Sequence, residues 1–152
     1  MNDMSFAYMD GLQSDNLSAR EEPLFPVFGY AGLVKMPEID RQQQFRNLMR
    51  ALAPGVMVFA NANAGKRSRA TARKEGIMAG VFDMTICWKP RRSAYLEAKG
   101  FDKSGRAGRL SDPQIRWGNG MHRIGHDVAC FYDPFHALDW LRSLGCEVRG
   151  AR

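Results

Sequence analysis

The sequence has few cysteines and no long apolar run, and both absences argue against whole classes of protein. Its three cysteines, Cys87, Cys130 and Cys146, are odd in number and form no C-x-x-C motif. This usage argues against a disulfide framework and a cysteine-based zinc site, so we expect reduced thiols in a cytosolic compartment. The longest apolar runs, such as GVMVFA, fall far short of the roughly 20 residues that a membrane span needs.

The first residues also lack a targeting signal. The stretch MNDMSFAYMDG carries acids where a secretory leader carries bases. We therefore expect a soluble, cytoplasmic protein with no membrane partner. A chain of 152 residues fits one domain, which is long enough to bury roughly two thirds of the surface of its unfolded chain.

Positive charge is distributed unevenly along the chain. Residues 1–40 hold seven acids and two bases, whereas residues 41–152 hold nine acids and twenty bases, so the two segments have net charges of −5 and +11. A body this basic favours a polyanionic partner, and nucleic acid is the obvious one, because each Lys or Arg that neutralises a phosphate releases counterions. The alternative is a basic surface that serves solubility alone.

The pattern of the chain changes near residue 36. Residues 1–36 lack sustained periodicity and predict an irregular N-terminal arm, while residues 37–152 predict one α/β domain. The domain is expected to begin with a helix and to end with a strand followed by a helix. Its expected elements are a helix over 37–53, a short buried strand over 56–60, a short helix over 69–76, strands over 80–88 and 93–100, a helix beginning at the N-cap Ser111, a strand over 127–132 and a helix over 133–144.

The stretch AYLEAKG, residues 94–100, combines a carboxylate with an ammonium. Side chains alternate along a strand, so Tyr95, Glu97 and Lys99 share one face. The preceding KPRR has the length and chemistry of a hairpin connection, and this hairpin would bring Asp83 near Glu97. Two carboxylates are a sufficient protein contribution to a magnesium site that a substrate phosphate completes, and such a site suits phosphodiester hydrolysis. The alternative is a half-buried strand whose polar face meets water.

Five motifs in order, PEIDRQ, NANAGKR, GVFD, LEAKG and LSDPQ, resemble the VRR-NUC branch of the PD-(D/E)XK nuclease superfamily. The resemblance spans about residues 37–144. It implies a restriction-endonuclease-like α/β fold of αβββαβ order, in which helices flank a mixed central sheet. The implied metal ligands for Mg²⁺ or Mn²⁺ are Asp83, Glu97 and the carbonyl of Ala98. The implied active site contains Asp83, Glu97, Lys99, Gln114 and Glu38, with Lys99 and Gln114 orienting the attacking water.

Three positions leave alternatives open. The family usually has a proline before the motif's aspartate, whereas this chain has Phe82. Glu38 has Asp40 nearby, and the dipole of a helix N-terminus favours any acid in its first turn. Gln114 also has the spacing of a capping-box partner for Ser111, so two roles compete for one side chain.

The resemblance implies DNA as the partner and no small-molecule cofactor. Small proteins that resemble this one are commonly homodimers that cut branched DNA such as four-way (Holliday) junctions. A symmetric dimer would place two active sites for two symmetric cuts. A flap nuclease, another structure-specific nuclease and a catalytically inactive DNA-binding module are the alternatives.

The expected DNA-binding residues lie in two basic segments, 61–68 and the mobile cationic loop 101–112. These residues are Asn63, Lys66, Arg67, Lys103, Arg106 and Arg109. For the first segment, ordinary turn chemistry is an equally good explanation. The apolar stretch PLFPVFGYAGLV, residues 23–34, is a candidate surface for pairing of two copies.

Overall fold

A computed structural model of the chain describes residues 20–61 and 69–150. It confirms the predicted order of elements. Within the described residues, no helix is long and apolar enough to cross a membrane. The elements are α2 (Glu38–Leu52), β1 (Met57–Ala60), α3 (Arg69–Lys74), β2 (Met84–Trp88), β3 (Arg92–Ala98), α4 (Asp112–Arg123), β4 (Asp127–Phe131) and α5 (Pro134–Ser143).

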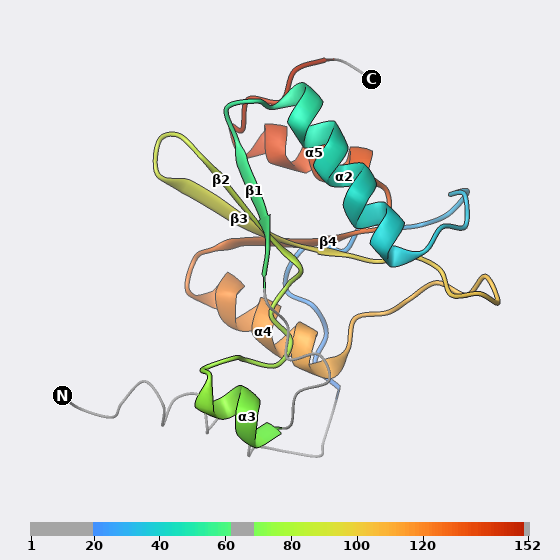
Figure 1. Ribbon diagram of the computed structural model, residues 1–152, viewed down its shortest axis with the longest axis vertical. Coiled ribbons are helices and arrows are strands. Elements are labelled where there is room, and N and C mark those ends of the chain that lie inside the picture. Colours follow the sequence, from blue (N-terminus) through green and yellow to red (C-terminus); the bar gives the residue numbers. More distant parts are fainter. Residues whose placement is uncertain (1–19, 62–68, 151–152) are drawn as a thin grey trace.

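Four strands form one mixed sheet in the order β1-β2-β3-β4. Strands β1, β2 and β3 pair antiparallel, whereas β4 lies parallel to β3 and is reached through α4, because a parallel neighbour needs a crossover connection. Helices α2 and α5 lie together over one face of the sheet, and α4 lies on the other (Figure 1). This is the restriction-endonuclease-like αβββαβ arrangement that the sequence predicts, with α3 inserted after β1.

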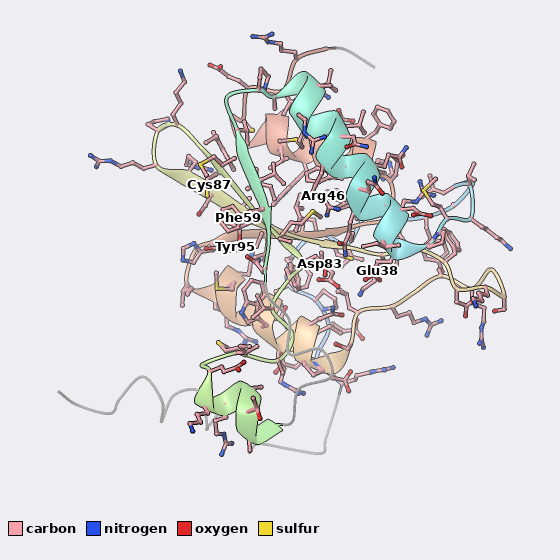
Figure 2. All side chains as sticks on the ribbon, in the orientation of Figure 1. Glu38, Arg46, Phe59, Asp83, Cys87 and Tyr95 are labelled. Carbon is pink, nitrogen blue, oxygen red and sulfur yellow. The ribbon has the colours of Figure 1, made fainter. Side chains whose placement is uncertain are left out.

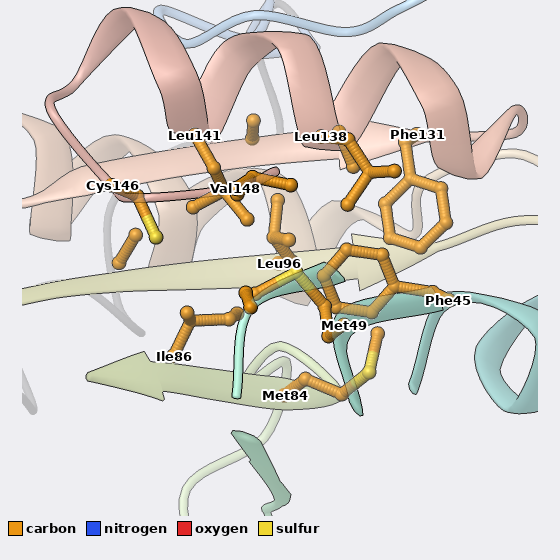
Figure 3. Close-up of a cluster of buried hydrophobic side chains, with 14 of the residues drawn as sticks. Phe45, Met49, Met84, Ile86, Leu96, Phe131, Leu138, Leu141, Cys146 and Val148 are labelled. Carbon is orange, nitrogen blue, oxygen red and sulfur yellow. The ribbon is translucent and has the colours of Figure 1, made fainter. Parts of the chain in front are cut away.

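The alternation of side chains along β3 divides the interior into two parts. Ala94, Leu96 and Ala98 face the main core under α2 and α5, which Figure 3 shows in close-up. Tyr95 and the side chains on its face point toward α4. Each large apolar side chain in the main core contributes roughly 1.5–3 kcal/mol to folding. Its largest fully buried members are Phe45, Met49, Met84, Ile86, Leu96, Phe131, Leu138 and Leu141.

Strand β1 differs from its prediction as a buried strand. It lies at the edge of the sheet, and the side chains of Met57 and Phe59 are 68% and 45% exposed. An apolar run of this length does not distinguish an edge strand from a central one, because burial depends on which partners the rest of the chain provides.

The described part of the N-terminal arm packs along β4. Cys130 N–H donates to Pro26 O, and Phe28 N–H donates to Cys130 O, both at 2.9 Å. Phe25 is buried, and a Cβ added to Gly118 of α4 would lie 2.4 Å from its ring. The apolar stretch that we expected to be available for pairing therefore has a partner within the chain for part of its length. The domain boundary at residue 36 stays a prediction.

Residues 101–109 form a turn organised by one carboxylate. Phe101 and Ala107 form an antiparallel bridge. Asp102 Oδ1 accepts hydrogen bonds from Ser104 Oγ at 2.6 Å, Ser104 N at 2.8 Å and Arg106 N at 3.0 Å. These bonds, that of the Ser104 hydroxyl first, lower the pKa of Asp102 to about 2. The segment is thus a turn with internal hydrogen bonds, while its mobility stays a prediction.

The three cysteines are free thiols, as the sequence predicts. Cys130 and Cys146 are buried, and burial raises the pKa of both. Neither therefore has the lowered pKa that a reactive thiolate needs.

Candidate active site

Three elements bring three carboxylates together. Glu38 comes from the first turn of α2, Asp83 from the residue before β2 and Glu97 from β3, and their carboxylate oxygens lie within 4.8 Å of one another. Figure 2 shows the first two side by side. Glu97 is fully buried and Asp83 is 8% exposed, so the alternative of a polar strand face in water is wrong. The Glu38 side chain is 42% exposed and opens the cluster to solvent.

Two backbone features explain this convergence. The β2–β3 register pairs Met84 with Leu96, and its continuation sets Asp83 opposite Glu97. After β3, Gly100 touches the start of α2, since a Cβ added there would lie only 2.3 Å from Glu38 N. The absence of a side chain at this position therefore lets the end of β3 meet the helix that carries the third acid.

Backbone amides fix two of the carboxylates. Asp83 N–H donates to Glu97 Oε2, and Ala98 N–H donates to Asp83 Oδ2, both at 3.1 Å. The two bonds are reciprocal across the hairpin, so each acid is oriented by the strand that carries the other. This arrangement pre-orients both side chains without help from a ligand.

Lys99 lies between the acids. Its Nζ donates to Glu97 Oε1 at 2.7 Å and lies 3.5 Å from Glu38 Oε2, and its side chain is 7% exposed. Burial works against the charged amine, but Glu97 and then Glu38 outweigh it and raise the pKa of Lys99. The amine is therefore held as a buried ammonium beside the carboxylates.

The acids crowd each other. Burial, followed by the charge of Asp83, raises the pKa of Glu97 to about 8 against the opposing effect of Lys99. Burial also raises the pKa of Glu38. Hard carboxylate oxygens in this spacing fit Mg²⁺ or Mn²⁺, and a divalent cation would relieve their mutual repulsion.

Gln114 uses the two ends of its amide for different partners. Its Oε1 accepts from Ser111 N at 2.9 Å, which completes the capping box of α4, while its Nε2 donates to Glu97 Oε1. The helix cap and the contact with the acid cluster thus occur together. The start of α4 packs closely against the backbone of Gly80, because a Cβ added at Gly80 would lie only 2.2 Å from Pro113 O.

Asn61 supports the backbone of the site, a role that sequence reasoning missed. Its Nδ2 donates to Phe82 O, and its Oδ1 accepts from Thr85 Oγ1, both at 2.8 Å. Its own N–H donates to Asp83 O at 2.8 Å. The only sequence signal was an asparagine directly after an apolar run, which is also ordinary turn chemistry.

Phe82, at the position where the resemblance expects a proline, points into the second core. It is fully buried, with its ring centroid 5.4 Å from that of Phe25 and 5.0 Å from that of Trp117. The side chain therefore packs under α4, while the backbone that follows it is held by hydrogen bonds of Phe82 O and Asp83 N–H.

The remaining predicted residues fall outside the cluster or outside the described chain. Asp40 is exposed, and Glu38 is the first-turn acid that meets the other two. A metal-binding role for the carbonyl of Ala98 stays a prediction. Lys103, Arg106 and Arg109 lie on the turn after Lys99, where Arg106 Nε pairs with Asp102 Oδ2 at 3.3 Å. Asn63, Lys66 and Arg67 lie outside the described residues.

The chain is similar to a solved structure described as a VRR_NUC domain. The two share 17% sequence identity, and the match covers 70% of this chain and 94% of that chain with a TM-score of 0.48. This is the family that the sequence motifs resemble. No protein family model and no curated protein matches the chain.

Proposed function

We propose that the protein is a Mg²⁺- or Mn²⁺-dependent endodeoxyribonuclease that cuts branched DNA, of the type that resolves four-way junctions. The observation that carries the proposal is the convergence of Glu38, Asp83 and Glu97 around a buried Lys99. The amide of Gln114 donates to the Glu97 carboxylate, as Lys99 does. A cluster of acids with one ammonium and one amide supplies ligands for a hard cation and donors for a water or phosphate oxygen.

The roles of the residues follow from these positions. Asp83 and Glu97, with the Ala98 carbonyl, would hold the metal ion, which supplies charge stabilisation at the scissile phosphate and a water of lowered pKa. Lys99 Nζ and Gln114 Nε2 donate hydrogen bonds and so orient the attacking water. Glu38 lies at the solvent-exposed side of the cluster, where substrate would enter.

Basic and amide side chains on the basic body would contact the DNA backbone and give recognition by shape rather than base sequence. The proposed contacts are Asn63, Lys66, Arg67, Lys103, Arg106 and Arg109. A homodimer would place two sites for paired cuts in a symmetric junction. Sedimentation of the full chain at micromolar concentration tests this: a dimer is expected, and a monomer that makes paired symmetric cuts would contradict it.

The decisive experiment is cleavage of a labelled four-way junction, beside a linear duplex of the same sequence, in Mg²⁺, Mn²⁺ or EDTA. Junction-specific cuts are expected with either metal and none with EDTA. Asp83→Asn and Glu97→Gln should abolish cleavage and metal binding in calorimetry, because each removes a ligand charge. Lys99→Ala should abolish cleavage but keep metal binding, since an ammonium repels the ion.

The matched control is Glu147→Gln, which removes an exposed acid elsewhere on the protein and should leave cleavage unchanged. Circular dichroism checks that each variant is folded. Wild-type cleavage by folded Asp83→Asn or Glu97→Gln protein would refute the nuclease proposal.

A further inference from the structure

A groove lies beside the acid cluster, between residues 30–35 and the turn 101–109. Its volume is about 770 Å³, which is within the range of sites that bind small ligands. We call it the Tyr30 groove. Both walls project from the same side of the molecule (Figure 1).

Both walls of the groove lead directly into the site. One wall continues through Met36 into Glu38, and the other starts two residues after Lys99. Phe101 N–H joins them by donating to Met36 O at 2.8 Å. The groove and the acid cluster are therefore built on neighbouring residues of the same two segments.

The groove is anchored to the folded body. Arg41 of α2 is 5% exposed, and its guanidinium donates to Val34 O. On the opposite wall, Gly108 N–H donates to Gly100 O at 2.8 Å, and Tyr132 Oη donates to Gly108 O at 2.6 Å. These bonds hold both walls in place.

The charge of the groove is positive. Lys35, Arg106 and Arg109 line it together with one acid, Asp102, which already pairs with Arg106. Among the residues that the structure describes, no acid lies within ion-pair distance of Lys35 or Arg109. Two cations therefore remain for an anionic ligand.

An exposed aromatic ring, that of Tyr30, lines the same groove as these cations. The Tyr30 side chain is 45% exposed, yet its ring is fixed by Phe101 at a centroid distance of 6.0 Å and by Tyr132 at 4.8 Å. A ring held by two others while part of its surface faces solvent is suited to stacking with a nucleobase. Phosphate contacts alone would need only the cations.

We propose that the Tyr30 groove binds an unpaired DNA strand, with a base stacked on Tyr30 and the adjoining phosphates on Lys35 and Arg109. This inference rests on the proposed nuclease function and specifies its substrate: a strand that is unpaired, or that becomes unpaired on binding, beside the phosphate to be cut. A base inside a duplex is stacked on both faces and cannot reach Tyr30, so the groove discriminates against paired DNA.

The test is fluorescence anisotropy in EDTA with a labelled oligothymidylate of about 15 nucleotides and a duplex of equal length. Tyr30→Ala should weaken binding of the single strand roughly tenfold and leave duplex binding unchanged. Tyr30→Phe keeps the ring and should bind as the unmodified chain does. Lys35→Ala and Arg109→Ala together should reduce the salt dependence of single-strand binding by about 0.7 in slope for each contact.

Lys89→Ala, an exposed cation in the β2–β3 turn, is the control for loss of charge and should keep the slope. Thermal unfolding verifies that Tyr30→Ala folds. Lys35→Ala tests the groove independently of folding, because this side chain is exposed. Unchanged single-strand binding in folded Tyr30→Ala, or equal weakening on both DNAs, would overturn the proposal. Binding is measured without metal and is therefore independent of cleavage. Tyr30-dependent binding by a chain that cuts no DNA in Mg²⁺ or Mn²⁺ would refute the nuclease and support the groove.

Discussion

Replacing Gly100 with alanine should separate the acid cluster without removing any of its members. The new Cβ would lie 2.3 Å from Glu38 N and 2.6 Å from Glu38 Cα, whereas ordinary contacts begin near 3.4 Å. The end of β3 and the start of α2 must therefore move apart by about 1 Å, and backbone atoms cannot turn aside as a flexible side chain can. Overpacking of this kind costs about 1–3 kcal/mol, and a displacement of about 1 Å at a reacting centre lowers the rate roughly 100-fold.

The assay combines thermal unfolding with junction cleavage at saturating metal. We expect Gly100→Ala to melt several degrees lower and to lose most of its cleavage rate. The control is Gly55→Ala, because a Cβ at Gly55 meets no atom within 4 Å. A Gly100→Ala protein with unmodified melting temperature and cleavage rate would refute the close approach of β3 to α2.

Three further predictions concern the acid cluster and its supports. The pKa of Glu97 is raised from 4.5 to about 8, so between these pH values the metal-free folded chain binds more protons than the unfolded chain. The free energy of unfolding in EDTA should therefore fall as the pH rises from 4.5 to about 8. Urea titrations at several pH values measure this fall, and its persistence in Glu97→Gln would contradict the assignment. Asn61→Ala should cost about 1–3 kcal/mol in urea unfolding and slow cleavage, because it leaves backbone at the site without a partner; unchanged stability would contradict its support role. Gly118→Ala should destabilise the chain by about 1–3 kcal/mol, because the new Cβ contacts Phe25. Gly120→Ala has open space around the new Cβ and should stabilise the chain by up to about 1 kcal/mol. Equal melting temperatures of the two variants would contradict the packing of Phe25 against α4.

Local signals predicted the helices and the hairpin well. The capping box of α4 depends on residues three apart, and the structure contains both of its hydrogen bonds. The side-chain alternation of β3 needs only the period of a strand, and it correctly put Glu97 and Lys99 on the face opposite Leu96. Such features depend on neighbours in the sequence, so one sequence suffices to find them.

The features that the sequence did not reveal depend on contacts between distant residues. The exposure of Met57 and Phe59 on β1 depends on what covers their face of the sheet: Val58 on the other face packs against the main core, whereas α4 packs on β4 at the opposite edge. The close approach of Gly100 to Glu38 joins residues far apart in the chain, and a lone glycine after a strand gives no sign of which backbone will meet it. Asn61 likewise has a partner at Phe82, which only the pairing of β1 with β2 brings near.

The two-ended use of Gln114 restricts which residues evolution can place at this position. Glutamate is the other common residue of a capping box, and its carboxylate would accept the Ser111 N–H equally well. It has no proton to donate to Glu97, however, and would add a fourth negative charge to a cluster that already raises the pKa of Glu97 to about 8. Asparagine carries the same amide on a side chain one methylene shorter. The helix alone would therefore tolerate several residues here, whereas the helix and the acid cluster together select glutamine.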